Sequence, residues 1–168
     1  MADPAPRVDQ NGPRFGEPST PWTSNFLSLA YNRPMTSLNE ERAWFLLVVA
    51  GRIVPEVAAL DERGRAQLLA IIDRALADRG PEVCRKFAVF LGVLRLAPVL
   101  RYGATFSRLR PHRQDAVLRW FESAPFGLLR QGTWGLKSMV FMGYYGRAEA
   151  WEEIGYAPSF DSLERLRA

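Results

Sequence analysis

Hydrophobic residues in this chain recur at intervals of three and four positions, which is the spacing of an amphipathic helix. The clearest run follows Asp61 and continues to about Arg79, and its apolar positions are Leu68, Leu69, Ile72, Ala75 and Leu76. Segments in which Val, Ile or Thr alternates with polar residues between hairpin turns, the pattern of a sheet, do not occur. The pattern therefore predicts an all-α fold.

Capping residues, proline and glycine divide this pattern into five helices, predicted over residues 38–54, 61–79, 81–102, 112–122 and 126–145. Ser37 and Glu40 have the spacing of a capping box at the first helix, and Pro55 ends that helix. A Gly-Pro pair separates the second helix from the third, and Gly146 is placed to end the fifth. We expect the five helices to pack as a compact bundle.

The third predicted helix is apolar on nearly every side between residues 87 and 100. A helix that is hydrophobic all round is usually buried. We therefore expect this segment to be central and the most buried part of the fold, with Pro98 kinking or ending the helix.

The composition suits one globular domain with a flanking segment at each end. The chain has 168 residues, of which 48% are hydrophobic and 24% charged. Residues 1–36 contain no apolar signal-peptide core and no twin arginine, and their Pro, Gly and polar content predicts a disordered or loosely docked arm. Trp22 and Phe26, near the end of this arm, are candidates to pin it to a surface. Residues 37–146 are the predicted helical domain, and residues 147–168 a predicted ordered, aromatic C-terminal docking tail.

The net charge of +4 comes almost entirely from arginine, since Lys86 and Lys137 are the only lysines. Arginine-rich surfaces suit carboxylate and phosphate pairing, although a GC-rich genome also favours arginine codons. The basic residues are interleaved with Asp and Glu along the chain, so no nucleic-acid-binding stripe is predicted.

The residues needed for catalysis or metal binding are scarce. Cys84 is the only cysteine, which excludes an intramolecular disulfide, and the apolar run after it favours a half-buried structural thiol. His112 is the only histidine, and one His with one distant Cys does not make a conventional zinc site. We therefore predict no catalytic residue, metal or cofactor on this chain, which does not look like an enzyme.

Aromatic residues gather in residues 128–156, at Trp134, Phe141, Tyr144, Tyr145, Trp151 and Tyr156. A core helix needs apolar residues at helical spacing, but it does not need aromatic residues in a non-helical tail beyond Gly146. Large rigid rings bury much area at little entropic cost, which suits anchors for another surface. Three of the six, Trp134, Phe141 and Tyr144, fall at helical spacing and are equally compatible with a core position.

The end of this segment resembles the C-terminal pattern of small accessory subunits of flavin-dependent GMC-type dehydrogenases, the gluconate 2-dehydrogenase subunit 3-like family. The shared pattern is a helix that closes in two tyrosines, followed by W-x-x-I/L-G-Y and a proline. It corresponds here to Tyr144, Tyr145, Trp151, Ile154, Gly155, Tyr156 and Pro158. The resemblance extends over roughly residues 38–158, and its specific part is residues 128–158.

The resemblance implies a heteromer in which this chain binds, stabilises and helps to mature a large FAD-dependent alcohol, sugar or steroid dehydrogenase. FAD and hydride abstraction then belong to the partner. The expected docking residues are Trp134, Tyr144, Tyr145, Trp151, Ile154, Gly155 and Tyr156. Many such subunits carry a twin-arginine signal that this chain lacks. We therefore expect a complex in the cytoplasm or on the cytoplasmic face of the inner membrane, where peripheral membrane association is compatible with the prediction.

Two other interpretations come from different functional classes. An independent helical protein could bind a lipid, a steroid or another apolar ligand in a cavity between residues 87–100 and 138–145. Such a protein is expected to be soluble and monomeric when expressed alone, whereas an obligate subunit is expected to aggregate. A DNA-binding regulator is the weaker alternative, because no recognition helix with clustered Arg and Asn is present.

Overall fold

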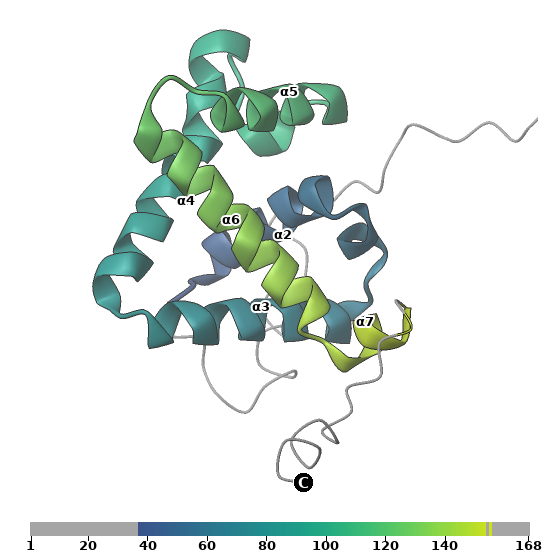
Figure 1. Cartoon of the computed structure of the whole chain (residues 1–168). Helices are drawn as coiled ribbons and strands as arrows, with labels where there is room; N and C mark the ends of the chain where they lie inside the picture. The colour runs from purple at the N-terminus through teal and green to yellow at the C-terminus, as the bar shows by residue number, and fades with distance from the viewer. Residues whose placement is uncertain (1–36, 154, 156–168) are drawn as a thin grey trace, which may run out of the picture.

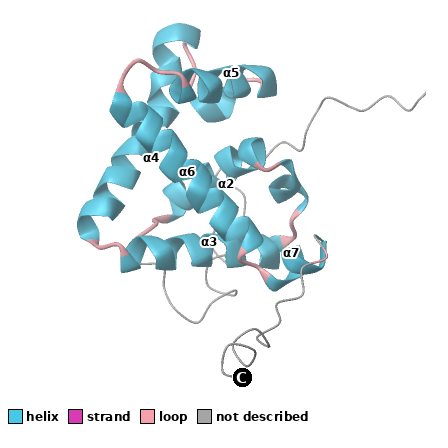
Figure 2. Cartoon of the chain, viewed as in Figure 1, coloured by secondary structure: helices cyan, strands magenta, loops and turns pink. Residues whose placement is uncertain are grey.

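The computed structural model describes residues 37–153 and residue 155, and all regular secondary structure in this part of the chain is helical (Figures 1 and 2). The α-helices are α2 (Glu40–Ile53), α3 (Glu62–Asp78), α4 (Pro81–Tyr102), α5 (Pro111–Glu122), α6 (Gly127–Tyr145) and α7 (Ala148–Glu153). Two short 3-10 helices, η1 (Pro55–Ala59) and η2 (Phe106–Arg108), join them. The predicted all-α fold is confirmed, while the arm predicted over residues 1–36, with Trp22 and Phe26, lies outside the described residues.

The most buried helix is α2. Its residues from Ala43 to Gly51 are buried, with Trp44 only partly so, and α2 packs against α4, α5 and α6. Near its end, the guanidinium of Arg52 donates two hydrogen bonds, of 2.8 and 2.6 Å, to the carboxylate of Asp115 in α5. The apolar sequence of α2 therefore forms the centre of the core, and a paired charge at its end ties it to α5.

The prediction that residues 87–100 are the most buried segment is wrong. Only one side of α4 faces the core, through Phe90, Leu91, Leu94 and Pro98, and much of the rest is exposed. A helix that is apolar on every side gives no signal of which side is covered, and α4 lies at the edge of the molecule (Figure 1). Pro98 does not end the helix, which continues to Tyr102 as predicted and stops at Gly103 in a left-handed conformation, with φ 67°.

The capping box predicted at Ser37 and Glu40 is also wrong. Asn39 caps α2, because its side-chain oxygen accepts a hydrogen bond of 3.0 Å from the Arg42 backbone N–H. The backbone N–H groups of Ser37 and Leu38 instead donate to one oxygen of Asp73 in α3, at 2.8 and 2.9 Å. The Ser37 N–H, which a capping box would pair with Glu40, thus donates to a carboxylate 36 residues away in the chain.

Helix α6 runs diagonally across the molecule in Figure 1 and packs against α2, α3, α4 and α5. Glycine permits two of these approaches. A Cβ at Gly132 would lie 2.3 Å from the ring of Phe90 in α4, and a Cβ at Gly143 would lie 2.9 Å from Ile72 in α3. The helix ends at Gly146 as predicted. The two contacts fix which side of α6 faces the core, and so which side faces outward.

Candidate docking surface

The outward side of α6 carries a row of aromatic residues, here called the aromatic strip: Trp134, Phe141 and Tyr145. They are 70%, 44% and 43% exposed, and their spacing of seven and four residues places them on one side of the helix. Phe141 and Tyr145 stack with ring centroids 6.3 Å apart. An exposed row of large rings is a feature of protein–protein contact sites rather than of a surface that faces only water.

Most of the other exposed residues on this side of α6 are small or uncharged. The charged exception is Arg130, one turn before Trp134, whose guanidinium donates to the backbone carbonyls of Ala124 and Pro125. Gly127, Gln131, Gly135 and Ser138 lie beside or between the aromatic residues. Interface centres are depleted of charged residues and enriched in aromatic ones. The strip therefore has both the residue types and the shape that an incoming apolar surface requires.

Tyr144, a predicted docking residue, lies in the core instead. Its side chain is only 3% exposed, and the guanidinium of Arg147 lies 4.6 Å from its ring centroid. Successive helical residues point about 100° apart, so the pair Tyr144–Tyr145 places one ring inward and the other outward. Of the two tyrosines, Tyr145 is the one available for a contact.

Trp151 does not lie in a non-helical tail as predicted, because residues 148–153 form the short helix α7. Its half-buried indole N–H donates a 2.6 Å hydrogen bond to the backbone carbonyl of Tyr145. Trp151 thereby lies against the end of α6 that carries the strip. Gly155 is exposed with φ 65°, and the predicted docking residues Ile154 and Tyr156 lie outside the described residues.

The turn between α6 and α7 is held by a buried arginine. Arg147 is buried, and its Nε donates to the Tyr144 carbonyl at 3.2 Å. Its Nη1 lies close to Gly64 in α3, since it would be 3.1 Å from a Cβ at that position. Ala150 of α7 is fully buried, so the helix packs on the core by one side. A polar anchor and an apolar contact together explain why the chain turns back here.

Glu149 adds a charge interaction to the same corner. The side-chain amide of Gln67 in α3 donates to its carboxylate at 3.4 Å. A hydrogen bond from its own backbone is the main cause that lowers the pKa of Glu149 below its ordinary value of 4.5. Burial opposes this shift, whereas the hydrogen bond from Gln67 and the charges of Arg147 and Arg63 add to it. The ionised form of Glu149 is thus favoured in the folded state.

Three further apolar residues are exposed although the sequence pattern did not indicate it: Trp120, Phe126 and Leu128, at 49%, 65% and 82%. Trp120 lies in the last turn of α5, in T-shaped contact with the buried Phe121, and the other two lie at the start of α6. Pro125 was a usable signal for the second pair, because residues around a helix start are often exposed. These three residues extend the apolar character of the surface beyond the aromatic strip.

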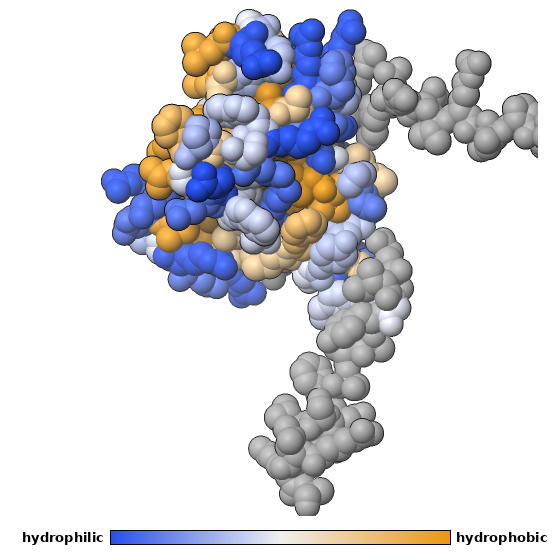
Figure 3. Space-filling view, turned by 45° about the horizontal axis from the view of Figure 1, so that its top comes forward, coloured by the Kyte–Doolittle hydropathy of each residue, from blue (hydrophilic) through white to orange (hydrophobic). Residues whose placement is uncertain are grey.

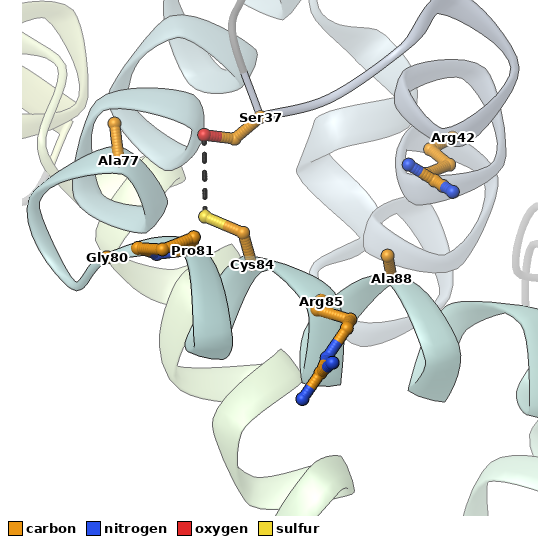
Figure 4. A pocket seen from close by; sticks show the side chains of 8 residues that line it. All are labelled: Ser37, Arg42, Ala77, Gly80, Pro81, Cys84, Arg85 and Ala88. Atoms are coloured by element: carbon orange, nitrogen blue, oxygen red, sulfur yellow. Dashed lines mark hydrogen bonds between the residues drawn. The ribbon is translucent and has the colours of Figure 1, made fainter.

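A separate pocket of about 490 Å³ opens between the end of α3 and the start of α4 (Figure 4). It is lined by Ser37, Arg42, Ala77, Gly80, Pro81, Cys84, Arg85 and Ala88. The half-buried Cys84 thiol, as expected, is structural in its contacts, since its S–H donates to the Leu76 carbonyl at 3.2 Å and Sγ lies 3.5 Å from Ser37 Oγ. This lining differs from the apolar cavity expected for a lipid or steroid binder.

Within the described ranges, no group of three or more His, Cys, Asp or Glu side chains is arranged to hold a metal ion. His112 is exposed at the first turn of α5. The helices of this part of the chain are too short or too polar to cross a bilayer.

Comparisons of this chain with protein-family models, with curated proteins and with solved structures found no match. The resemblance to the small accessory subunits therefore rests on the residues that carry it.

Proposed function

We propose that this chain is a non-catalytic small subunit that binds and stabilises a large FAD-dependent GMC-type dehydrogenase. The observation that carries the proposal is the aromatic strip, above all Trp134, which is 70% exposed on the outward side of α6. An indole left in water forgoes the stabilisation that burial of its large apolar area would bring. A surface of this kind is typical of a contact site for a partner.

The resemblance selects the partner. The tyrosine pair at the end of α6 and the tryptophan that follows are the positions shared with the subunits of flavin-dependent dehydrogenases. In the proposed complex, Tyr145 and Trp151 contact the flavoprotein, while Tyr144 holds the corner that presents them. FAD and the reacting groups stand on the large chain, and this chain keeps that chain folded and soluble.

Co-expression tests the proposal directly. The chain, with an affinity tag, is produced together with the flavoprotein encoded beside it, recognisable by a G-x-G-x-x-G motif near its start. We expect a heteromer that elutes with flavin absorbance, and a colourless, inactive small subunit once the two are separated. A soluble, monomeric chain that leaves the yield and flavin content of the flavoprotein unchanged would contradict the proposal and favour an independent ligand-binding protein.

A further inference from the structure

The outer side of α4 carries a second apolar row, distinct from the aromatic strip and here called the α4 stripe: Val89, Val93, Leu96 and Leu100. All four are exposed, Leu100 to 96%. Figure 3 shows orange side chains breaking the hydrophilic surface on the side where α4 lies. The row lies opposite the buried residues Phe90, Leu91 and Leu94, so the core of the described domain does not use it.

The spacing of the four residues places the α4 stripe on one side of the helix. Its residues follow at intervals of four, three and four, which keeps them within one narrow band along the helix. At the ends of the band, Glu82 pairs with Lys86 at 2.6 Å and Arg101 lies in the last turn. Midway along α4, Arg95 lies on another side of the helix, where it pairs with Glu41 of α2. Between these ends the row is free of charge over about 17 Å at 1.5 Å per residue. A segment that covers the α4 stripe should therefore be apolar and uncharged.

The described part of the chain begins beside this helix. The Ser37 backbone is fixed by Asp73, and the Ser37 hydroxyl lies 3.5 Å from Cys84 Sγ, in the first turn of α4 (Figure 4). The residues that precede Ser37 therefore start next to the base of α4. From Cys84 to Leu100 the helix rises about 24 Å, and the chain between Phe26 and Ser37 spans up to about 36 Å. The stripe lies roughly 150° around α4 from Cys84, at about 100° per residue, so the chain must also pass about 15 Å around a helix of about 10–12 Å diameter. The extended length from Phe26 to Ser37 covers the rise and this turn together, so residues 26–31 can reach the α4 stripe.

Residues 26–31 also have a matching composition. They read FLSLAY, with no charged residue and one serine among six positions. We infer that this segment, which lies outside the described residues, covers the α4 stripe and completes the domain. The inference concerns a surface separate from the aromatic strip, so it stands or fails independently of the proposed partner.

Thiol accessibility tests this inference on the full chain. Because Cys84 is the only cysteine, Cys84→Ser combined with Leu96→Cys gives one reporter thiol on the α4 stripe. A second chain adds Phe26→Ser, Leu27→Ser and Leu29→Ser. We expect the reporter to react with a soluble aromatic disulfide reagent about tenfold faster in the second chain, because loss of the cover removes the need for local opening. Trp134→Cys in the same two backgrounds is the matched control, and its rate should not change.

Three results would overturn the inference. Equal rates at Leu96→Cys in both chains mean that nothing covers the stripe. Protection that rises with protein concentration in both chains means that a second copy of the chain covers it. If the rate at Trp134→Cys also rises, the serine variant has unfolded, and the rates no longer report on the cover. Disulfide formation then tests the contact instead. Leu29→Cys is then paired in turn with Val93→Cys and Leu96→Cys without Cys84, and failure of both pairs to form an intramolecular disulfide contradicts the contact.

Discussion

Glycine at position 132 sets how closely α6 approaches α4. A side chain there would place its Cβ 2.3 Å from the Phe90 ring, whereas a Cβ at Gly135, one turn further on, would meet nothing within 4 Å. Both glycines lie inside the same helix, so both carry the same intrinsic cost in helix propensity. They differ in packing alone.

We therefore predict opposite effects for two alanine substitutions. Gly132→Ala should lower the free energy of unfolding by about 1–3 kcal/mol, because the added methyl group overpacks the contact with Phe90. Gly135→Ala should raise it by up to about 1 kcal/mol through helix propensity. Urea unfolding of the two variants measures both values. Equal changes in the same direction would mean that α4 and α6 do not meet at Gly132.

Asp73 supports a second prediction at the same scale. Its buried side chain accepts from the backbone of Ser37 and Leu38, so Asp73→Ala leaves two amides without this acceptor. The expected loss is about 2–3 kcal/mol in the free energy of unfolding. Asp78→Ala, at the exposed end of the same helix, is the control and should change stability by less than about 0.5 kcal/mol. Similar losses of unfolding free energy in Asp73→Ala and Asp78→Ala would show that Asp73 does not anchor the backbone of Ser37 and Leu38.

Among the elements, α7 is the one whose stability depends most visibly on pH. The pKa of Glu149 is lowered in the folded state, first by its backbone hydrogen bond, so its ionised form stabilises the fold. This contribution is present above the unfolded pKa and is lost as the pH falls through the folded pKa. As the pH falls through this lowered pKa, we expect α7 to loosen and the hydrogen bond of the Trp151 indole to Tyr145 to weaken.

The indole N–H proton resonance of Trp151 measures this effect. In a titration from pH 6 to pH 3, this resonance should shift or broaden in the natural chain. The change should be centred below 4.5, the ordinary pKa of a Glu side chain. In Glu149→Gln, which cannot titrate, the same change should be absent. An identical pH dependence in both chains would assign the transition to another carboxylate.

Local chemistry explains which elements were predictable. Pro55, Pro111 and Gly146 mark helix ends through backbone geometry alone, and the predicted ends there agree with the structure within a residue or two. The α2 cap was wrong because Asp73, distant in sequence, binds the Ser37 amide. The burial of α4 was wrong because an apolar helix carries no sign of which side meets the core. These two errors needed tertiary contacts that periodicity does not encode.

The exposed aromatic residues proposed for docking were predictable only as a group. The aromatic composition of α6 indicated a surface, but the separation of the exposed Tyr145 from the buried Tyr144 depends on the helix phase set by Gly132 and Gly143. The helical state of Trp151 depends on Arg147, whose contacts lie in α3 and at the end of α6. Sequence thus located the segment, and packing selected its outward residues.

At the scale of the whole molecule, the surface divides into two apolar regions on different helices. The aromatic strip on α6 carries large rings, which suit a hot spot, whereas the α4 stripe carries aliphatic residues that match the chain's own residues 26–31. We propose that the partner binds the first surface and that the N-terminal segment covers the second. It also supplies a matched control for partner binding, because both surfaces are apolar and lie outside the core of the described helices.

Binding of the flavoprotein to two double variants tests the central claim most directly. Trp134→Ser with Tyr145→Ser removes the aromatic strip, and Val89→Ser with Leu96→Ser removes a comparable part of the α4 stripe. The dissociation constant is measured by titration of each purified variant, with circular dichroism to verify the fold. The account predicts binding weaker by about 100-fold or more for the strip variant, since each lost hot-spot ring costs about 2 kcal/mol. It predicts a change of less than about threefold for the stripe variant. Unchanged binding by the strip variant, or a large loss confined to the stripe variant, would contradict it.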